Sequence, residues 1–153
     1  MEFKNNKNKK APLWLILALL LISLLGFIDA GYLTAKHFQG ETPTCSLIKG
    51  CDIVTTSQYA EIFGVPVALL GVLYYLTIFI LSLIYLDTQN KQVLKIIPGL
   101  TVLGLAASIY FVILQLFVIK ALCLYCLGSA LTSTALFILG MFIWKKKKIY
   151  NQL

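Results

Sequence analysis

The stretch ALCLYCLGSALTSTALFILGMFIW, residues 121–144, decides what kind of molecule this chain is. It is apolar over the roughly 20 residues that a helix needs to cross a bilayer, and it carries Cys123 and Cys126 near its start. Residues three apart on a helix share one face, and the first helical turn presents free backbone N–H groups and a positive dipole end that favour a thiolate. The stretch therefore predicts a reactive thiol pair at the mouth of a membrane span.

Three further apolar runs of similar length precede this one. With 59% hydrophobic and 12% charged residues in a chain of 153, the composition lies far outside the range of soluble domains. Because lipid offers no hydrogen-bond partners to the backbone, runs of this length should be helical. The sequence thus predicts an all-α, integral membrane bundle of four transmembrane helices with an extracytoplasmic cap loop. The expected spans are Leu13 to Leu33, Val65 to Leu86, Ile96 to Ile119 and Ala121 to Trp144.

All 13 basic residues are lysines, and they are unevenly distributed about these spans. Ten of them precede the first span, lie in the 87–95 loop or follow the fourth span, whereas only Lys36, Lys49 and Lys120 lie on the other side. The positive-inside rule then places both termini and the 87–95 loop in the cytoplasm, with all four cysteines facing outward. We interpret the lysines as topology anchors beside anionic lipid rather than as contacts for nucleic acid.

The predicted organisation is a basic cytoplasmic tail at 1–12, a four-helix membrane domain at 13–144 and a basic cytoplasmic tail at 145–153. The first apolar run is longer than a typical signal-peptide core, and its removal would leave three spans, so we expect an uncleaved first helix. The segment 36–63 is the extended polar stretch outside the membrane, and it carries Cys45 and Cys51. We expect this outer loop to cap the bundle.

Four outward-facing cysteines leave three interpretations open. Disulfides persist outside the cytoplasm, and Cys45, Cys51, Cys123 and Cys126 can pair in three ways. A structural bridge within CLYC would close almost no loop, whereas CxxC spacing is typical of redox cycling and of metal sites. Redox-active pairs are the favoured interpretation. The alternatives are structural bridges in a non-enzymatic membrane protein that binds a partner, and a four-thiolate zinc or iron–sulfur site, which the wider spacing of the loop pair disfavours.

Redox cycling needs an electron acceptor, because thiol exchange only moves a disulfide from one pair to another. The pair at the bilayer lies where lipophilic quinones reside. A few polar groups in an apolar lining suit a ring with two carbonyls, and the candidates are Ser57, Tyr110, Gln115 and Tyr125. A buried Gln115 amide needs a hydrogen-bond partner, which either a neighbouring helix or a quinone oxygen would supply.

Two longer segments resemble a known family. They are CSLIKGCDIVTTSQYAEIFGVPVALLGVLYY, residues 45–75, and QLFVIKALCLYC, residues 115–126. The paired loop cysteines, a serine six residues after the second of them, the FGVP helix start and the terminal CxxC occur in the order typical of the bacterial branch of the vitamin K epoxide reductase family. The resemblance covers roughly residues 26–130.

The resemblance implies a quinone-dependent membrane thiol-disulfide oxidoreductase that generates disulfides. Cys123 and Cys126 would form the active-site pair, with Cys126 reacting with the quinone. Cys45 would meet an external thiol partner, and Cys51 would exchange with Cys123.

The resemblance also implies the site around the acceptor and the setting of the reaction. Ser57 matches a serine near the quinone head, and Gln115 falls where family members line the quinone pocket. Ala130 stands where vertebrate members carry a tyrosine implicated in vitamin K binding, so the expected acceptor is a respiratory quinone, menaquinone or ubiquinone. The expected partner is a separate extracytoplasmic thioredoxin-like protein, because the sequence stops at Leu153 without the fused domain of some relatives. The expected location is the bacterial cytoplasmic (inner) membrane.

Overall fold

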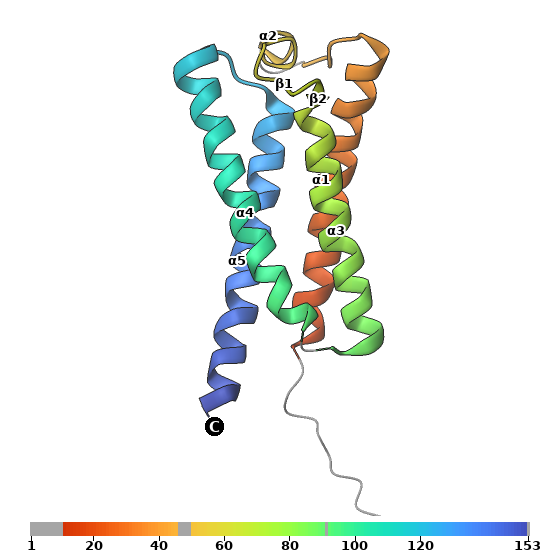
Figure 1. Cartoon of the computed structure of the whole chain (residues 1–153), viewed down its shortest axis with the longest axis vertical. Helices are drawn as coiled ribbons and strands as arrows, with labels where there is room; N and C mark the ends of the chain where they lie inside the picture. The colour runs from red at the N-terminus through yellow and green to blue at the C-terminus, as the bar shows by residue number, and fades with distance from the viewer. Residues whose placement is uncertain (1–10, 46–49, 91, 153) are drawn as a thin grey trace, which may run out of the picture.

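Four long helices run side by side, and a small cap lies across one end of them (Figure 1). This computed structural model describes residues 11–45, 50–90 and 92–152. The long helices are α1 (Leu13–Gln39), α3 (Val67–Thr88), α4 (Val93–Ile113) and α5 (Leu124–Gln152), and α4 continues into a π-helical segment, η1 (Leu114–Ile119). All four are long and apolar enough to cross a membrane, which confirms the predicted all-α bundle.

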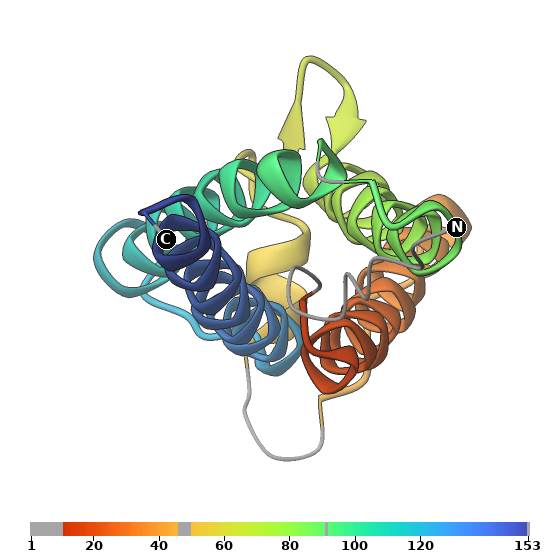
Figure 2. The ribbon, with the colours of Figure 1, turned by 90° about the horizontal axis from the view of Figure 1, so that it is seen from below.

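The helices form a ring in the order α1, α3, α4, α5, as Figure 2 shows from below. Each helix packs on its two neighbours, and the contact of α5 with α1 closes the ring. The connection from α3 to α4 lies at one end. The long connection from α1 to α3 and the short one from η1 to α5 lie at the other end, together with the cap (Figure 1).

The cap consists of a short helix, α2 (Cys51–Thr55), and a hairpin of β1 (Glu61–Ile62) with β2 (Val65–Pro66). In Figure 2, α2 lies behind the centre of the ring, so it covers the open end of the bundle. Phe63 and Gly64 both have positive φ, 52° and 78°, which is the backbone geometry of a tight two-residue hairpin turn. Phe63 is fully exposed at this turn.

The largest buried cluster lies at the end of the bundle away from α2. Its members come mainly from the first turns of α1 and α4 and the later turns of α3 and α5: Leu15, Ile16, Leu19, Tyr85, Val93, Leu94, Ile97, Leu136 and Ile143. In lipid, close packing of this kind holds helices together, because apolar surface gains little by leaving a hydrocarbon solvent. The bundle is therefore tightly packed at the end opposite the cap.

Small residues and one tyrosine join three of the helices in mid-bundle. The ring of Tyr75 on α3 packs directly against Gly26 on α1, where a larger residue would clash. The Tyr75 hydroxyl lies 2.8 Å from the carbonyl oxygen of Ser129 and 2.8 Å from Oγ1 of Thr132, both on α5. Close helix approach of this kind is typical of membrane bundles, in which small residues let the backbones come near one another.

Several predicted boundaries differ from the structure. The first helix continues past Leu33 to Gln39, into the predicted outer loop 36–63. The fourth helix begins at Leu124 rather than Ala121, because Lys120 adopts the left-handed conformation (φ 54°) and residues 120–123 form a non-helical link. It also continues to Gln152, through most of the predicted 145–153 tail. Of the predicted tail at 1–12, residues 1–10 lie outside the described part of the chain.

Candidate thiol relay site

The two cysteine pairs are in different states. Cys45 and Cys51 form a disulfide with a Cα–Cα distance of 6.1 Å. Cys123 and Cys126 are free thiols. Cys51 is the first residue of α2 and is 1% exposed, while Cys123 immediately precedes α5 and is fully buried. One oxidised and one reduced pair therefore lie at the capped end of the bundle.

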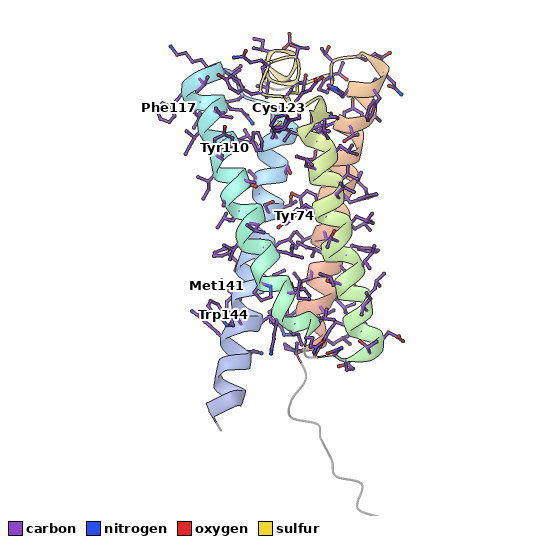
Figure 3. The ribbon with its side chains drawn as sticks, in the orientation of Figure 1. Tyr74, Tyr110, Phe117, Cys123, Met141 and Trp144 are labelled. Atoms are coloured by element: carbon purple, nitrogen blue, oxygen red, sulfur yellow. A yellow bond between two sulfur atoms is a disulfide. The ribbon has the colours of Figure 1, made fainter. Side chains whose placement is uncertain are left out.

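All four cysteines belong to one cluster. Its buried members are Cys51, Val54 and Cys123, and the partly buried side chains packed against them include Cys45 and Cys126. Figure 3 shows Cys123 at the top of α5, beneath the cap. The cap thus brings the loop disulfide to the free thiols, from positions some seventy residues away in the sequence.

A glycine makes this approach possible. Gly50, immediately before α2, has φ 149°, a backbone conformation that other residues rarely adopt. A Cβ atom at this position would lie 2.9 Å from the carbonyl oxygen of Leu122, which is closer than such contacts occur in proteins. The backbone of the cap therefore touches the backbone of the CLYC segment at the residues that precede Cys51 and Cys123.

Gln115 holds the link between η1 and α5. The Cys123 backbone N–H donates to Oε1 of Gln115 at 3.2 Å, and the Ala121 N–H donates to the Gln115 carbonyl oxygen, also at 3.2 Å. Gln115 is 3% exposed and lies in the π-helical segment, a feature that is frequent at functional sites. The sequence predicts a neighbouring helix or a quinone oxygen as the partner of the Gln115 amide. In the structure the amide oxygen accepts from the backbone of Cys123, next to the start of α5.

The hydrogen bond from the Cys126 thiol lowers the pKa of Cys123 to about 7. Burial opposes this change, backbone N–H groups of Cys126 and Tyr125 add to it, and the charge of Asp29 opposes it. A thiolate is the nucleophile in disulfide exchange. Cys123 thus has the protonation behaviour of a reactive thiol near neutral pH, on the side that faces Cys51.

A cavity of about 380 Å³ lies inside the bundle between the cap and mid-membrane. Most of its lining is apolar, and Cys126 is the cysteine that reaches it. The polar side chains in the lining are His37, Thr55, Ser57, Tyr59, Tyr74, Tyr75, Ser108, Gln115, Ser129 and Ser133. Small residues on facing helices, among them Gly71 and Gly104, leave the space open.

The structure brings some of the predicted site residues together and separates others. Ser57 and Gln115 both line the cavity with Cys126. Tyr110 does not: its side chain is 57% exposed, and the next residue, Phe111, faces the cavity instead. The prediction for Tyr110 is corrected because the helical period points it away from the bundle interior. Tyr125 also lies outside the lining.

The sequence prediction did not include most of the cavity residues, among them Tyr74 and His37. Tyr74 lies between the helices (Figure 3), with its ring against Gly104 of α4. His37, at the end of α1, lines the cavity and places Nε2 at 3.1 Å from Oε1 of Glu61 in the hairpin. An aromatic residue on one span and a glycine on another, here Tyr74 and Gly104, indicate that two helices can approach closely. The sequence does not show which aromatic residue meets which glycine.

A bundle of four spanning helices with two cysteine pairs meeting under a cap defines a membrane thiol–disulfide protein class. Residues 17–141 match the family described as the vitamin K epoxide reductase family, and the chain belongs to that family. The chain is also similar to the thiol-disulfide oxidoreductase LTO1 of Arabidopsis thaliana, with 32% identity over 122 residues. That match covers 74% of this chain and 32% of the plant protein, so the chain spans about a third of its relative's length.

Proposed function

We propose that this chain is a membrane thiol-disulfide oxidoreductase that generates disulfides. The observation that carries the proposal is the single cluster containing all four cysteines, with one pair oxidised and the other free. Membership of the vitamin K epoxide reductase family and similarity to a plant thiol-disulfide oxidoreductase support the same reaction class.

In this proposal the electrons pass inward from pair to pair. A reduced partner gives two electrons to the Cys45–Cys51 disulfide, and Cys51 then attacks the Cys123 sulfur of the oxidised inner pair. Cys126 leaves as the thiolate, and attack of Cys45 on Cys51 restores the loop disulfide and releases Cys123. The observed state, with an oxidised loop pair and a reduced inner pair, corresponds to the end of this sequence.

The proposed acceptor is a respiratory quinone of the menaquinone or ubiquinone type. The cavity fits such a ring, since it is mostly apolar and offers Ser57 and Gln115 near Cys126. Oε1 of Gln115 accepts the Cys123 N–H, and the amide nitrogen makes no hydrogen bond within the described part of the chain, so it can donate toward a quinone carbonyl. The net reaction converts one dithiol and one quinone to one disulfide and one quinol.

The proposed setting is the bacterial cytoplasmic membrane, with both termini inside. Lys145 and Lys146 lie at the end of the bundle opposite the cap, which agrees with the positive-inside rule if the cap faces outward. The proposed electron donor is a separate thioredoxin-like protein outside the cytoplasm that reaches Cys45, which is partly exposed whereas Cys51 is buried.

The test is quinone reduction by the purified full chain in detergent, with a reduced thioredoxin-like protein or a small dithiol as the donor. Wild type should turn over with both donors, and Cys126→Ala should have no activity with either. Cys45→Ala should lose the protein donor while keeping the small dithiol, which can reduce the inner pair directly. Thr56→Ala, an exposed position in the same cap, should behave as wild type.

Absence of quinone reduction in wild type, with all four cysteines resistant to alkylation until they are reduced, would overturn the proposal. It would favour instead a partner-binding membrane protein with two structural bridges. Unchanged turnover in Cys126→Ala would remove Cys126 from the reaction.

A further inference from the structure

Asp29 is an acidic side chain within the first spanning helix, four residues before the predicted end of that span at Leu33. It lies in α1, ten residues before the helix ends at Gln39. The other acidic residue within a described spanning helix, Asp87, is exposed in the last turns of α3. Ionisable residues inside the bilayer are costly and mark proton or substrate pathways more often than structural roles. Asp29 therefore needs an explanation.

No partner in the described part of the chain supplies one. The Oδ2 atom of Asp29 is buried and makes no hydrogen bond to the described residues. Lys36, two turns further along α1, is paired with Glu41 instead. A buried polar atom without a partner is destabilising, so a purely structural role would weaken the fold rather than stabilise it.

Asp29 lies close to the start of α5. It is one helical turn before Tyr32, on the same face of α1, and the Tyr32 ring packs at a tilt of 37° against Tyr125 of α5, with centroids 5.1 Å apart. Tyr125 precedes Cys126. The negative charge of Asp29 acts on Cys123, which immediately precedes α5, and on Tyr125 and Cys126 in its first turn.

The other titratable groups near Asp29 leave it the best placed base. The titratable groups at and just before the start of α5 are Cys123, Tyr125 and Cys126, and on α1 itself Asp29 shares a face with Tyr32. On α3, the Tyr75 hydroxyl is engaged with Ser129 and Thr132. Among these groups, which are otherwise thiols and tyrosine hydroxyls, Asp29 is the carboxylate and therefore the group that can accept a proton from a thiol.

We propose that Asp29 is the proton-transfer group of the Cys123–Cys126 dithiol. This inference rests on the proposed oxidation of the pair by a quinone. In that step the S–H bonds of Cys123 and Cys126 break, one S–S bond forms, and two electrons and two protons go to the quinone. Asp29 lies outside the cavity lining, which Cys126 reaches. It takes the Cys126 proton as that sulfur is oxidised, gives it up as the quinone is reduced and ends as the carboxylate in which it began. The second proton comes from Cys123.

A purely electrostatic role for Asp29 and a proton-transfer role lead to opposite expectations for the oxidation rate of Asp29→Asn. Asp29 opposes the lowering of the Cys123 pKa by the Cys126 hydrogen bond. Asp29→Asn keeps the shape of the side chain and removes the charge, so it should increase the thiolate fraction of Cys123. If Asp29 did no more than this, the variant would be oxidised at least as fast as wild type. If Asp29 accepts the proton, the variant is slower.

The test follows one turnover: pre-reduced full chain in detergent is mixed with a soluble quinone from pH 5.5 to 9, and quinol formation is recorded. Asp29→Asn should be slower by on the order of a hundredfold at neutral pH, as for loss of a positioned proton-transfer group. Its rate should rise with pH more steeply than that of wild type. Asp29→Glu should recover most of the rate, and Asp87→Asn should match wild type.

A second measurement needs no quinone. The pH dependence of Cys123 alkylation in Asp29→Asn should keep a midpoint near or slightly below that of wild type, which shows that the pair remains folded. If wild type reduces quinone and Asp29→Asn does so at the same rate with the same pH profile, the role of Asp29 is overturned and the proposed function stands. Lack of quinone reduction in wild type overturns the proposed function and this inference together.

Discussion

The side-chain oxygen of Gln115 accepts the backbone N–H of Cys123 at 3.2 Å, which couples the start of η1 to the first reactive cysteine. Four non-helical residues separate η1 from α5, and this contact holds the last of them in place. The position of Cys123 relative to Cys51 therefore depends on a residue that lies eight positions earlier in the sequence.

Replacing Gln115 should misplace Cys123. Gln115→Met keeps the length of the side chain and leaves the buried Cys123 N–H without an acceptor, which costs about 1–3 kcal/mol. We expect a lower thermal midpoint and slower oxidation of the inner pair. Gln115→Glu, which keeps an acceptor oxygen, should recover part of the loss. Leu116→Met, an exposed neighbour in η1, is the control, and equal effects at both positions would contradict the assigned contact.

Removing the Cys126 thiol should make Cys123 less acidic. A hydrogen bond to a thiolate stabilises the charged form, so its loss in Cys126→Ala should raise the pKa of Cys123 from about 7 toward the ordinary value of a cysteine. The measurement is the rate of Cys123 alkylation against pH, read by peptide mass spectrometry. Ser129→Ala, one turn further along α5, should leave the midpoint near pH 7. An unchanged midpoint in Cys126→Ala would show that another group sets the acidity.

A methyl group at position 50 should separate the two cysteine pairs. Gly50→Ala places a Cβ against the Leu122 carbonyl at a strained φ, so the cap must move away from the CLYC segment. We expect quinone reduction with a protein donor to fall at least tenfold, while reduction with a small dithiol is preserved. Gly31→Ala is the matched control, since a Cβ there meets nothing within 4 Å. Equal turnover with both donors in Gly50→Ala would mean that exchange does not need this contact.

The Tyr75 hydroxyl should contribute to stability rather than to turnover. Tyr75→Phe removes its contacts with Ser129 and Thr132 on α5, and we expect a loss of about 1–2 kcal/mol in unfolding free energy. Tyr110→Phe removes a hydroxyl from an exposed side chain and should be neutral. Denaturation in mixed detergent micelles, followed by circular dichroism, compares the two. The same midpoint for both variants would contradict the interhelical role.

The spans could be predicted from sequence because they depend on length and apolar composition alone. Four runs without interior charge clusters leave the backbone only one way to satisfy its hydrogen bonds in lipid, and the helices follow. The start of α5 was misplaced for a different reason. The apolar run is continuous through residues 121–123, and the break depends on the left-handed conformation of Lys120 and on hydrogen bonds to Gln115.

Within the site, spacing identified the cysteines but not their surroundings. The CxxC spacing at the start of a span identifies Cys123 and Cys126 as candidate redox cysteines without knowledge of the fold. The cavity, in contrast, depends on how four helices pack. Tyr110 and Tyr74 illustrate the difference: both are tyrosines within spans, and only the rotation of each helix decides that Tyr74 faces inward and Tyr110 outward. The hairpin at Glu61–Pro66 was missed because two-residue strands carry no periodic signal.

The tightly packed cluster at the end opposite the cap bears on which reductants can reach the cysteine pairs. With the cap outward, as proposed, the first turns of α1 and α4 form a plug between the relay and the cytoplasm. Cytoplasmic glutathione and thioredoxin would otherwise reduce the inner pair and short-circuit the chain of exchange. In that orientation Leu15, Ile16 and Ile97 would separate two redox compartments without taking part in the exchange reactions.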